Sequence, residues 1–187
     1  MIRVTWEWLG ADLALDVANT MAVSGGVEHD LLDAEGEYER WARAAGPALA
    51  PDQAAVLPAA RSRILRLRTA IRDVLFAAAR DEPLPTSAVD ELNRLSRKAA
   101  TWLELDERGR RHERTTADPV GRLLAGYARS AIEVAAAGSG RLRTCPAPSC
   151  GMFYRPTRAA QRWCSVPCGT RARVARHYRA ADRAPVA

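Results

Sequence analysis

The sequence contains almost no lysine: Lys98 is the only one, so arginine supplies the rest of the 28 basic residues. Cysteine is absent outside positions 145–168, and there are only three histidines. No apolar run approaches the roughly 20 residues that a membrane-spanning helix needs. The first residues also lack a basic segment that leads into an apolar one, so no secretion signal is indicated. These absences predict a cytoplasmic protein with no membrane partner.

Signatures of common enzyme classes are missing as well. There is no glycine loop of the kind that cradles phosphates and no G-x-S-x-G nucleophile motif. His29, His112 and His177 lie in no recognisable nucleophile or metalloprotease pattern. The carboxylates are scattered over amphipathic helices, where solvation explains them. We therefore expect no enzyme; the alternative, an acid such as Asp16 acting in a helical pocket, would need a turnover assay to support it.

Charge is distributed unevenly along the chain. The formal net charge is +6, but residues 141–187 contain ten arginines and a single acidic residue, Asp182. The last 47 residues therefore carry +9 and the first 140 carry −3. Abundant arginine, alanine and proline are typical of GC-rich genomes. The uneven distribution of charge therefore indicates more about function than the total net charge does. A basic end on a mildly acidic body indicates a nucleic-acid-facing surface.

The first 140 residues have the apolar spacing of a mainly α-helical (α+β) domain. The longest predicted helix starts near Pro51-Asp52, and Pro58 interrupts it. Its apolar positions recur at helical spacing: Ile64, Leu67, Ile71, Leu75 and Ala78. Further helices are predicted over about 34–45 with Asp33 as cap, from Thr86 or Ser87 onward, and from Pro119 to about 137. Residues 13–20 predict a short buried helix or strand, closed by a loop at 24–26.

One stretch of this domain changes from helical to alternating spacing. Residues 101–105 alternate, 106–109 turn and 110–116 can return, which predicts a β-hairpin. Gly138-Ser139-Gly140 ends the last helix of the domain. We place the domain boundary there, between a helical domain over 1–140 and a basic module over 141–187.

All four cysteines lie in the basic module. Four residues lie between Cys145 and Cys150, three lie between Cys164 and Cys168, and thirteen lie between the two pairs. Four thiolates suit a closed, tetrahedral structural zinc site, because no position is left for water. The spacer is long enough for a β-hairpin that brings the pairs together. We expect one structural Zn²⁺ ion that supplies the folding energy of this small module; an iron–sulfur cluster, disulfides and unligated thiols stay open.

Residues from Ser165 to about Ala181 predict a helix with two unlike sides. Val174, Tyr178 and Ala181 share one side, which we expect to pack on the zinc core. The other surfaces of the helix and the preceding loop are basic, and arginine can hold phosphates or read guanine. We expect nucleic-acid contacts from Arg155, Arg158, Arg162, Arg171, Arg173, Arg176 and Arg179. The alternatives are an acidic protein partner, self-association, and plain solvation.

These residues resemble a known family. Cys145 to Phe153 (CPAPSCGMF), Arg162-Trp163-Cys164-Ser165 and Cys168-Gly169-Thr170-Arg171 are similar to the CGNR zinc finger. Leu15 to Thr20 (LDVANT) resembles the opening motif of the ABATE domain, which members of that family carry and which is described as a stress-induced transcription regulator. The resemblance implies that the four cysteines bind zinc, that the finger binds DNA, and that the N-terminal domain senses a signal.

Two positions depart from the family pattern. Thr170 replaces the signature asparagine, and we expect this change to alter a polar contact at the start of the helix. Arg155-Pro156 stands where an acidic residue often follows the Phe153 position, which makes this surface more basic. Neither change removes a metal ligand.

The sequence therefore predicts a DNA-binding transcription regulator with a treble-clef or ribbon-like zinc finger. The N-terminal domain is expected to bind a small-molecule effector or to form a homodimer. Asp16, Asn19 and Thr20 could line its ligand pocket, or could instead cap or end the first element. The alternative function is a zinc-stabilised protein-interaction or assembly module that does not bind nucleic acid.

Overall fold

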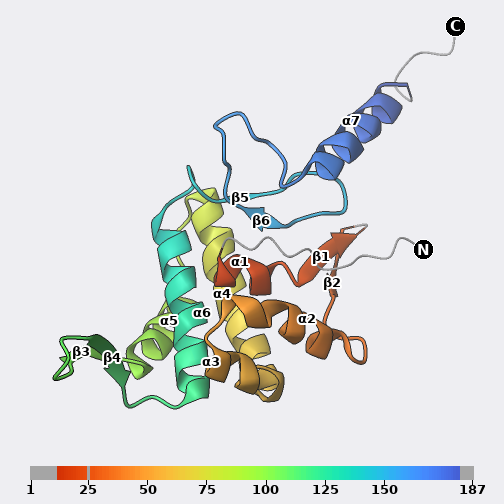
Figure 1. The fold of residues 1–187 in the computed structure, drawn as a ribbon. Coiled ribbons are helices and arrows are strands. Elements are labelled where there is room, and N and C mark those ends of the chain that lie inside the picture. Colours follow the sequence, from red (N-terminus) through yellow and green to blue (C-terminus); the bar gives the residue numbers. More distant parts are fainter. Residues whose placement is uncertain (1–11, 25, 182–187) are drawn as a thin grey trace, which may run out of the picture.

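The computed structural model describes residues 12–24 and 26–181, with the side chains of all of these except Ser24 and 179–181. Residues 12–140 form a helical part, called the body below. Residues 141–181 form a smaller part, called the finger, which lies on one end of the body (Figure 1). None of the described helices is both long enough and apolar enough to cross a membrane.

The body consists of helices joined by short turns and two small hairpins. In chain order its elements are α1 (Leu13–Ala18), β1 (Met21–Ser24), β2 (Val27–Asp30), α2 (Glu37–Ala45), η1 (Gly46–Ala48), α3 (Pro51–Val56), η2 (Pro58–Ala60), α4 (Arg61–Arg80), α5 (Thr86–Lys98), β3 (Thr101–Leu105), β4 (Arg111–Thr115) and α6 (Pro119–Ala136). The finger adds β5 (Arg143–Thr144), β6 (Phe153–Tyr154) and α7 (Val166–Ala181). The predicted mainly α-helical class is confirmed.

The core of the body lies between α4, α5 and α6, with α1 packed against α4 and α6. The predicted apolar stripe of α4 is buried there, from Ile64 through Ile71 to Ala78. Tyr38 and Trp41 of α2 fill the space beside it. Burial of such side chains contributes about 1.5–3 kcal/mol each, so this stripe stabilises the body substantially.

Local chemistry sets several helix ends. Pro58 separates α3 from α4, as predicted, because it cannot donate the backbone hydrogen bond of a continuous helix. The carboxylate of Asp118 caps α6 by accepting the N–H of Gly121 at 2.7 Å. The prediction that Asp33 starts a helix near residue 34 is wrong. Gly36, with φ of +76°, precedes α2 in the left-handed region that favours glycine, so the helix begins only at Glu37.

The two hairpins of the body differ in how well the sequence predicts them. Strands β3 and β4 pair with Thr101 opposite Thr115, which confirms the predicted hairpin. Strands β1 and β2 pair with Met21 opposite Asp30. Only the loop of the β1–β2 hairpin was predicted, because its short strands have no clear alternation of apolar and polar residues. The β3–β4 hairpin lies at the end of the body remote from the finger (Figure 1).

Helix α7 extends away from the rest of the molecule (Figure 1). Val174 is 49% exposed and Tyr178 is 66% exposed. The prediction that this side packs on the zinc core is therefore wrong for these two residues, and Ala181 lies outside the described side chains. The core of the finger is small, and Trp163 and Ala172 already cover it near the start of the helix. The following turns have no described surface to pack against.

Two buried tyrosines of the body provide a test of its packing. The hydroxyl of Tyr38 donates to the carbonyl of Leu57 at 2.8 Å, whereas the buried hydroxyl of Tyr127 has no hydrogen-bond partner among the described residues. We expect Tyr38→Phe to lower the free energy of unfolding by about 1 kcal/mol, because it removes one of the two hydrogen bonds that the Leu57 carbonyl accepts and leaves only that from the Ala60 N–H. Tyr127→Phe should cost less or be neutral. Urea denaturation of both variants checks this, and an equal loss in both would contradict it.

Candidate metal centre and nucleic-acid interface

The finger brings its four cysteines together from two local structures. Cys145 and Cys150 lie in the loop between β5 and β6, which the Cys145 N–H closes by donating to the Met152 carbonyl at 2.8 Å. Cys164 precedes α7, and Cys168 lies in its first turn. This is the treble-clef arrangement, a knuckle loop facing the start of a helix. The prediction of a hairpin within the spacer is wrong, because the hairpin instead encloses the first cysteine pair.

The distances between the sulfurs match one tetrahedral zinc ion. All four Sγ atoms lie within 4.8 Å of one another. Three of the separations are 3.7 Å for Cys150–Cys164, 3.5 Å for Cys164–Cys168 and 3.6 Å for Cys150–Cys168. A tetrahedron with Zn–S bonds of about 2.3 Å has edges of about 3.8 Å. A disulfide would need about 2.05 Å, so none of these pairs is bonded.

The electrostatics of four adjacent thiols favour a bound cation. Hydrogen bonds from the thiols of Cys150 and Cys164 lower the pKa of Cys145. The same thiols become harder to ionise, because each donates to or lies beside that thiolate: the pKa of Cys150 rises to about 12 and that of Cys164 rises further. The thiols alone can therefore share little negative charge, whereas a Zn²⁺ ion stabilises all four as thiolates. The donor set and its geometry fit one structural zinc.

The residues after Cys168 complete the centre. A side chain at Gly169 would place its Cβ 3.2 Å from the ring of Trp163, which is tighter than an ordinary contact, so glycine lets the indole lie close to the first turn of α7. The guanidinium of Arg171 donates to the Cys168 sulfur at 3.0 Å and offsets the charge of the thiolates. Thr170, where the family has asparagine, bonds within the helix to the Val166 carbonyl at 3.3 Å.

Asn19 fastens the finger to the body. Its side-chain amide donates to the Phe153 carbonyl at 2.9 Å, and its Oδ1 accepts the Phe153 N–H at 2.8 Å. The amide thus pairs with β6 as a neighbouring strand would. Beside it, the N–H of Val23 in β1 donates to the Cys150 carbonyl at 3.3 Å. The backbone of the cysteine loop is therefore held by two segments of the body.

Phe153 is fully buried and belongs to the core of the body, as does Leu142. The ring of Phe153 lies edge-on to that of Phe76 in α4, with 4.6 Å between the ring centroids. The guanidinium of Arg72 lies over both rings, at 5.1 Å from the Phe76 centroid and 5.9 Å from that of Phe153. The core is therefore not divided at the predicted boundary near residue 140.

Two buried arginines of α4 support the segment that carries Asn19. Arg72 donates to the Ala18 carbonyl at 2.9 Å and pairs with Glu28. Arg68 donates to the Thr20 hydroxyl at 2.9 Å and pairs with Asp30. Burial raises the pKa of Asp30, but the hydrogen bonds from Arg68 and the Leu32 N–H outweigh it and bring that pKa below its ordinary value. Neither arginine was predicted as a functional residue; their four-residue spacing beside the apolar stripe of α4 was the available signal.

The residues predicted to line a ligand pocket belong to the segment that attaches the finger to the body. Asp16, Asn19 and Thr20 are all buried. Both polar atoms of the Asn19 side chain are used by Phe153, and the Thr20 hydroxyl donates to the Val17 carbonyl while accepting from Arg68. Asn19 and Thr20 thus have structural contacts that account for their burial.

The predicted nucleic-acid residues fall into two groups. Arg155 pairs with Asp12 of the body at 3.1 Å, and Arg171 faces the Cys168 sulfur. The others are exposed, and none forms an ion pair with a carboxylate in the described part of the chain: Arg158, Arg162, Arg173 and Arg176. The side chain of Arg179 lies outside the described residues.

Comparisons with known families agree with this architecture. Residues 11–138 match the ABATE family, described as "Putative stress-induced transcription regulator", and residues 141–181 match the CGNR zinc finger. The chain therefore belongs to the ABATE family and carries a CGNR zinc finger. Comparison with curated proteins gave no match.

The metal content gives a direct test of the centre. We expect the purified protein to hold one zinc ion per chain, and Cys150→Ser to lower this content well below one, because three thiolates and a hydroxyl bind zinc more weakly. Ser149→Ala, in the same loop but not among the four sulfurs, should keep the full content. Elemental analysis checks both, and a Cys150→Ser protein with a full zinc ion would contradict the assignment.

The attachment of the finger predicts a second result. Asn19→Ala removes two hydrogen bonds and leaves a buried N–H and C=O without partners, which costs about 2–4 kcal/mol. We expect the Phe153 amide to exchange its hydrogen much faster in this variant. Asn93→Ala on α5 is the matched control, since it removes the same side chain away from the finger. Unchanged protection of Phe153 would show that Asn19 does not hold β6.

Proposed function

We propose that this protein is a transcription regulator that binds DNA through its zinc finger. The observation that carries the proposal is the concentration of positive charge in the finger. Residues 141–181 contain nine arginines and no acidic residue, whereas residues 1–140 carry a net negative charge. Arg158, Arg162, Arg173 and Arg176 are exposed and have no described carboxylate partner. Several exposed, positively charged guanidiniums on a single module favour binding to a polyanion.

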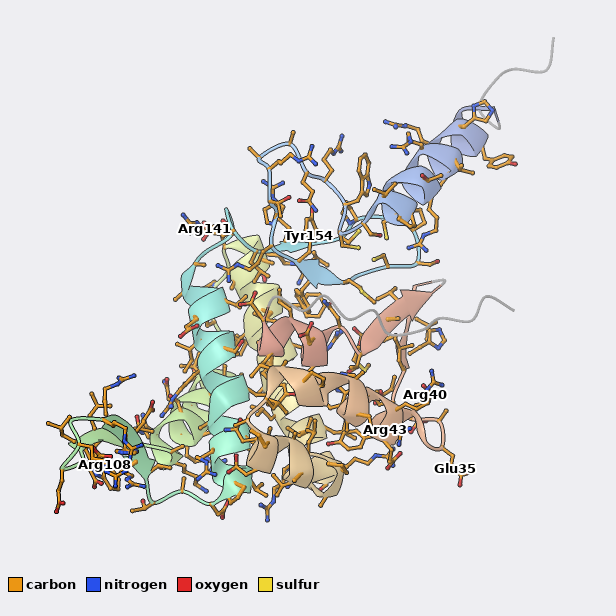
Figure 2. The ribbon with its side chains drawn as sticks, in the orientation of Figure 1. Glu35, Arg40, Arg43, Arg108, Arg141 and Tyr154 are labelled. Carbon is orange, nitrogen blue, oxygen red and sulfur yellow. The ribbon has the colours of Figure 1, made fainter. Side chains whose placement is uncertain are left out.

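The arrangement of the finger supports this partner. Zinc fixes the start of α7, and the helix then projects into solvent beyond the body (Figure 1). A projecting basic helix has the dimensions to enter the major groove of DNA, where arginine can contact phosphates and guanine edges. Figure 2 shows that the labelled Tyr154 and Arg141 lie at the finger end, whereas Arg108 lies in the β3–β4 hairpin at the opposite end. We assign the DNA-facing role to the finger end.

One observation favours a second function. Val166, Val174 and Tyr178 are exposed on α7, and their spacing of four or eight residues places them on one side of it. Exposed apolar side chains along one helix side are typical of protein contacts. The second candidate is therefore a protein-interaction or self-association module, stabilised by zinc and independent of nucleic acid.

A sensing role for the body is part of the proposal. An apolar cavity of about 180 Å³ opens between α4, α5 and α6, and Asn93 is the one polar residue among its described lining residues. The cavity is smaller than most ligand pockets, so it suits only a small apolar effector with a single hydrogen-bonding group. This cavity lies away from Asp16, Asn19 and Thr20, where the sequence analysis placed a ligand pocket.

Fluorescence anisotropy on a random-sequence duplex tests DNA binding. We expect the zinc-loaded protein to bind, with affinity that falls steeply between low and moderate salt because counterions are released. Chelation should abolish binding. The Arg173→Gln/Arg176→Gln double variant should bind about tenfold more weakly or worse, and its salt slope should be shallower by about 1 to 2.

The matched control is Arg108→Gln/Arg111→Gln, which changes the net charge equally in the β3–β4 hairpin. This control should bind DNA as the parent protein does. If the zinc-loaded protein fails to bind at low salt, the DNA-binding function is wrong and the protein-interaction module is favoured. Equal losses in both double variants would mean that net charge, not the finger, governs binding.

A further inference from the structure

The finger contains an open cavity between the loop over 157–163 and the start of α7, with a volume of about 420 Å³. Three arginines line it: Arg158 and Arg162 from the loop and Arg173 from the helix. No acidic residue is among its described lining residues. The lining also includes the zinc ligand Cys164, but its three arginines and the absence of a carboxylate leave the surface with net positive charge, which suits an anion.

The loop that forms one wall of this cavity is braced. The Oε1 of Gln161 accepts the N–H of Thr157 at 2.8 Å, and its Nε2 donates to the Trp163 carbonyl at 3.0 Å. Arg143 of β5 donates to the carbonyls of Ala159 and Gln161, the latter at 2.6 Å. These bonds hold the loop in one conformation. A ligand that binds there therefore orders the loop at a smaller cost in conformational entropy.

Two of the lining arginines are also held in place. The guanidinium of Arg162 lies 5.7 Å from the centroid of the Trp163 ring. Arg173 donates to the Thr170 hydroxyl at 3.2 Å. Thr170 stands at the position where the family has asparagine, so the hydrogen bond with Arg173 involves a residue that departs from the family pattern. Guanidiniums positioned before binding lose less freedom when they take up an anion.

The zinc thiolates do not account for this positive charge. Among the described hydrogen bonds to the sulfurs, the charged donor is the Arg171 guanidinium, at 3.0 Å from the Cys168 sulfur, and the backbone N–H groups of Ala147, Met152 and Cys164 are further donors. Among the described contacts, Arg158, Arg162 and Arg173 make no hydrogen bond to a sulfur. Their charge is therefore available to a ligand.

We propose that this cavity binds one phosphate group, which Arg158, Arg162 and Arg173 hold. Each guanidinium offers a planar fork of N–H donors that matches two phosphate oxygens. A carboxylate presents its two oxygens in one plane, whereas the tetrahedral phosphate presents oxygens in several directions: two non-bridging and two ester oxygens in the DNA backbone, and three non-bridging oxygens in a phosphate monoester. The volume leaves room for the rest of a nucleotide beside the Trp163 ring. The phosphate has two sources, the DNA backbone or a free phosphate-bearing molecule, and only the first rests on the proposed function.

Titration of the full-length, zinc-loaded protein with inorganic phosphate tests the site. Ionic strength is held constant with chloride, and NMR follows the Trp163 indole N–H and the amides of Gln161 and Arg162. We expect saturable shifts at these positions. Arg158→Gln/Arg162→Gln should weaken the binding at least about tenfold, because it removes two of the three forks. Arg108→Gln/Arg111→Gln should leave it unchanged, and zinc content confirms that each variant keeps its centre.

A DNA arm distinguishes the two sources. If phosphate displaces a duplex more strongly than chloride of equal ionic strength, the cavity holds a backbone phosphate. If the phosphate-saturated protein binds the duplex undiminished, the cavity takes a free phosphate-bearing molecule. Absence of saturable shifts, or equal phosphate binding by Arg158→Gln/Arg162→Gln and the parent, overturns the proposed site. Saturable phosphate binding without any DNA binding overturns the proposed function alone.

Discussion

The pairing of the Asn19 amide with the Phe153 backbone is the contact on which the relation of body and finger depends. It lies in a buried interface, where an unmet N–H or C=O is costly. It fixes β6, and β6 in turn fixes the loop that carries Cys145 and Cys150. The geometry of half of the metal centre is thus determined by a side chain of the first helix segment. The polar end of the LDVANT segment acts as a structural joint.

Arginine has three different roles in this chain, and its surroundings decide which one applies. Arg68 and Arg72 are buried, and each is matched by a carboxylate and by oxygens of the α1–β1 segment, since an unmatched buried charge would be costly. Arg171 offsets the charge of the thiolates. The arginines around the 157–163 loop have neither kind of partner. The near-absence of lysine means that all three roles use a planar group whose charge does not titrate.

The sequence predicted the features whose causes are local. The cysteine spacings indicate a zinc centre because two short loops suffice to form it, and the apolar spacing of α4 indicates its buried side. The partner of Asn19 could not be predicted, because Phe153 lies 134 residues away and no local pattern links them. The exposed side of α7 was misjudged for a related reason. Spacing shows that Val174 and Tyr178 share a side of the helix, but not whether another surface lies against it.

Phe153 lies in the finger by sequence, but its side chain packs in the core of the body. This arrangement limits where the chain can be divided. A body cut after Gly140 would lose the ring that packs against Phe76 and beneath Arg72. The resulting void is comparable to a Phe→Ala change, which costs about 3–5 kcal/mol. The body therefore has no complete interior without Phe153 and Leu142. An ancestor that exchanged one piece for an unrelated domain would have had to repair that interior, which gives a physical reason for the two to be inherited as one unit.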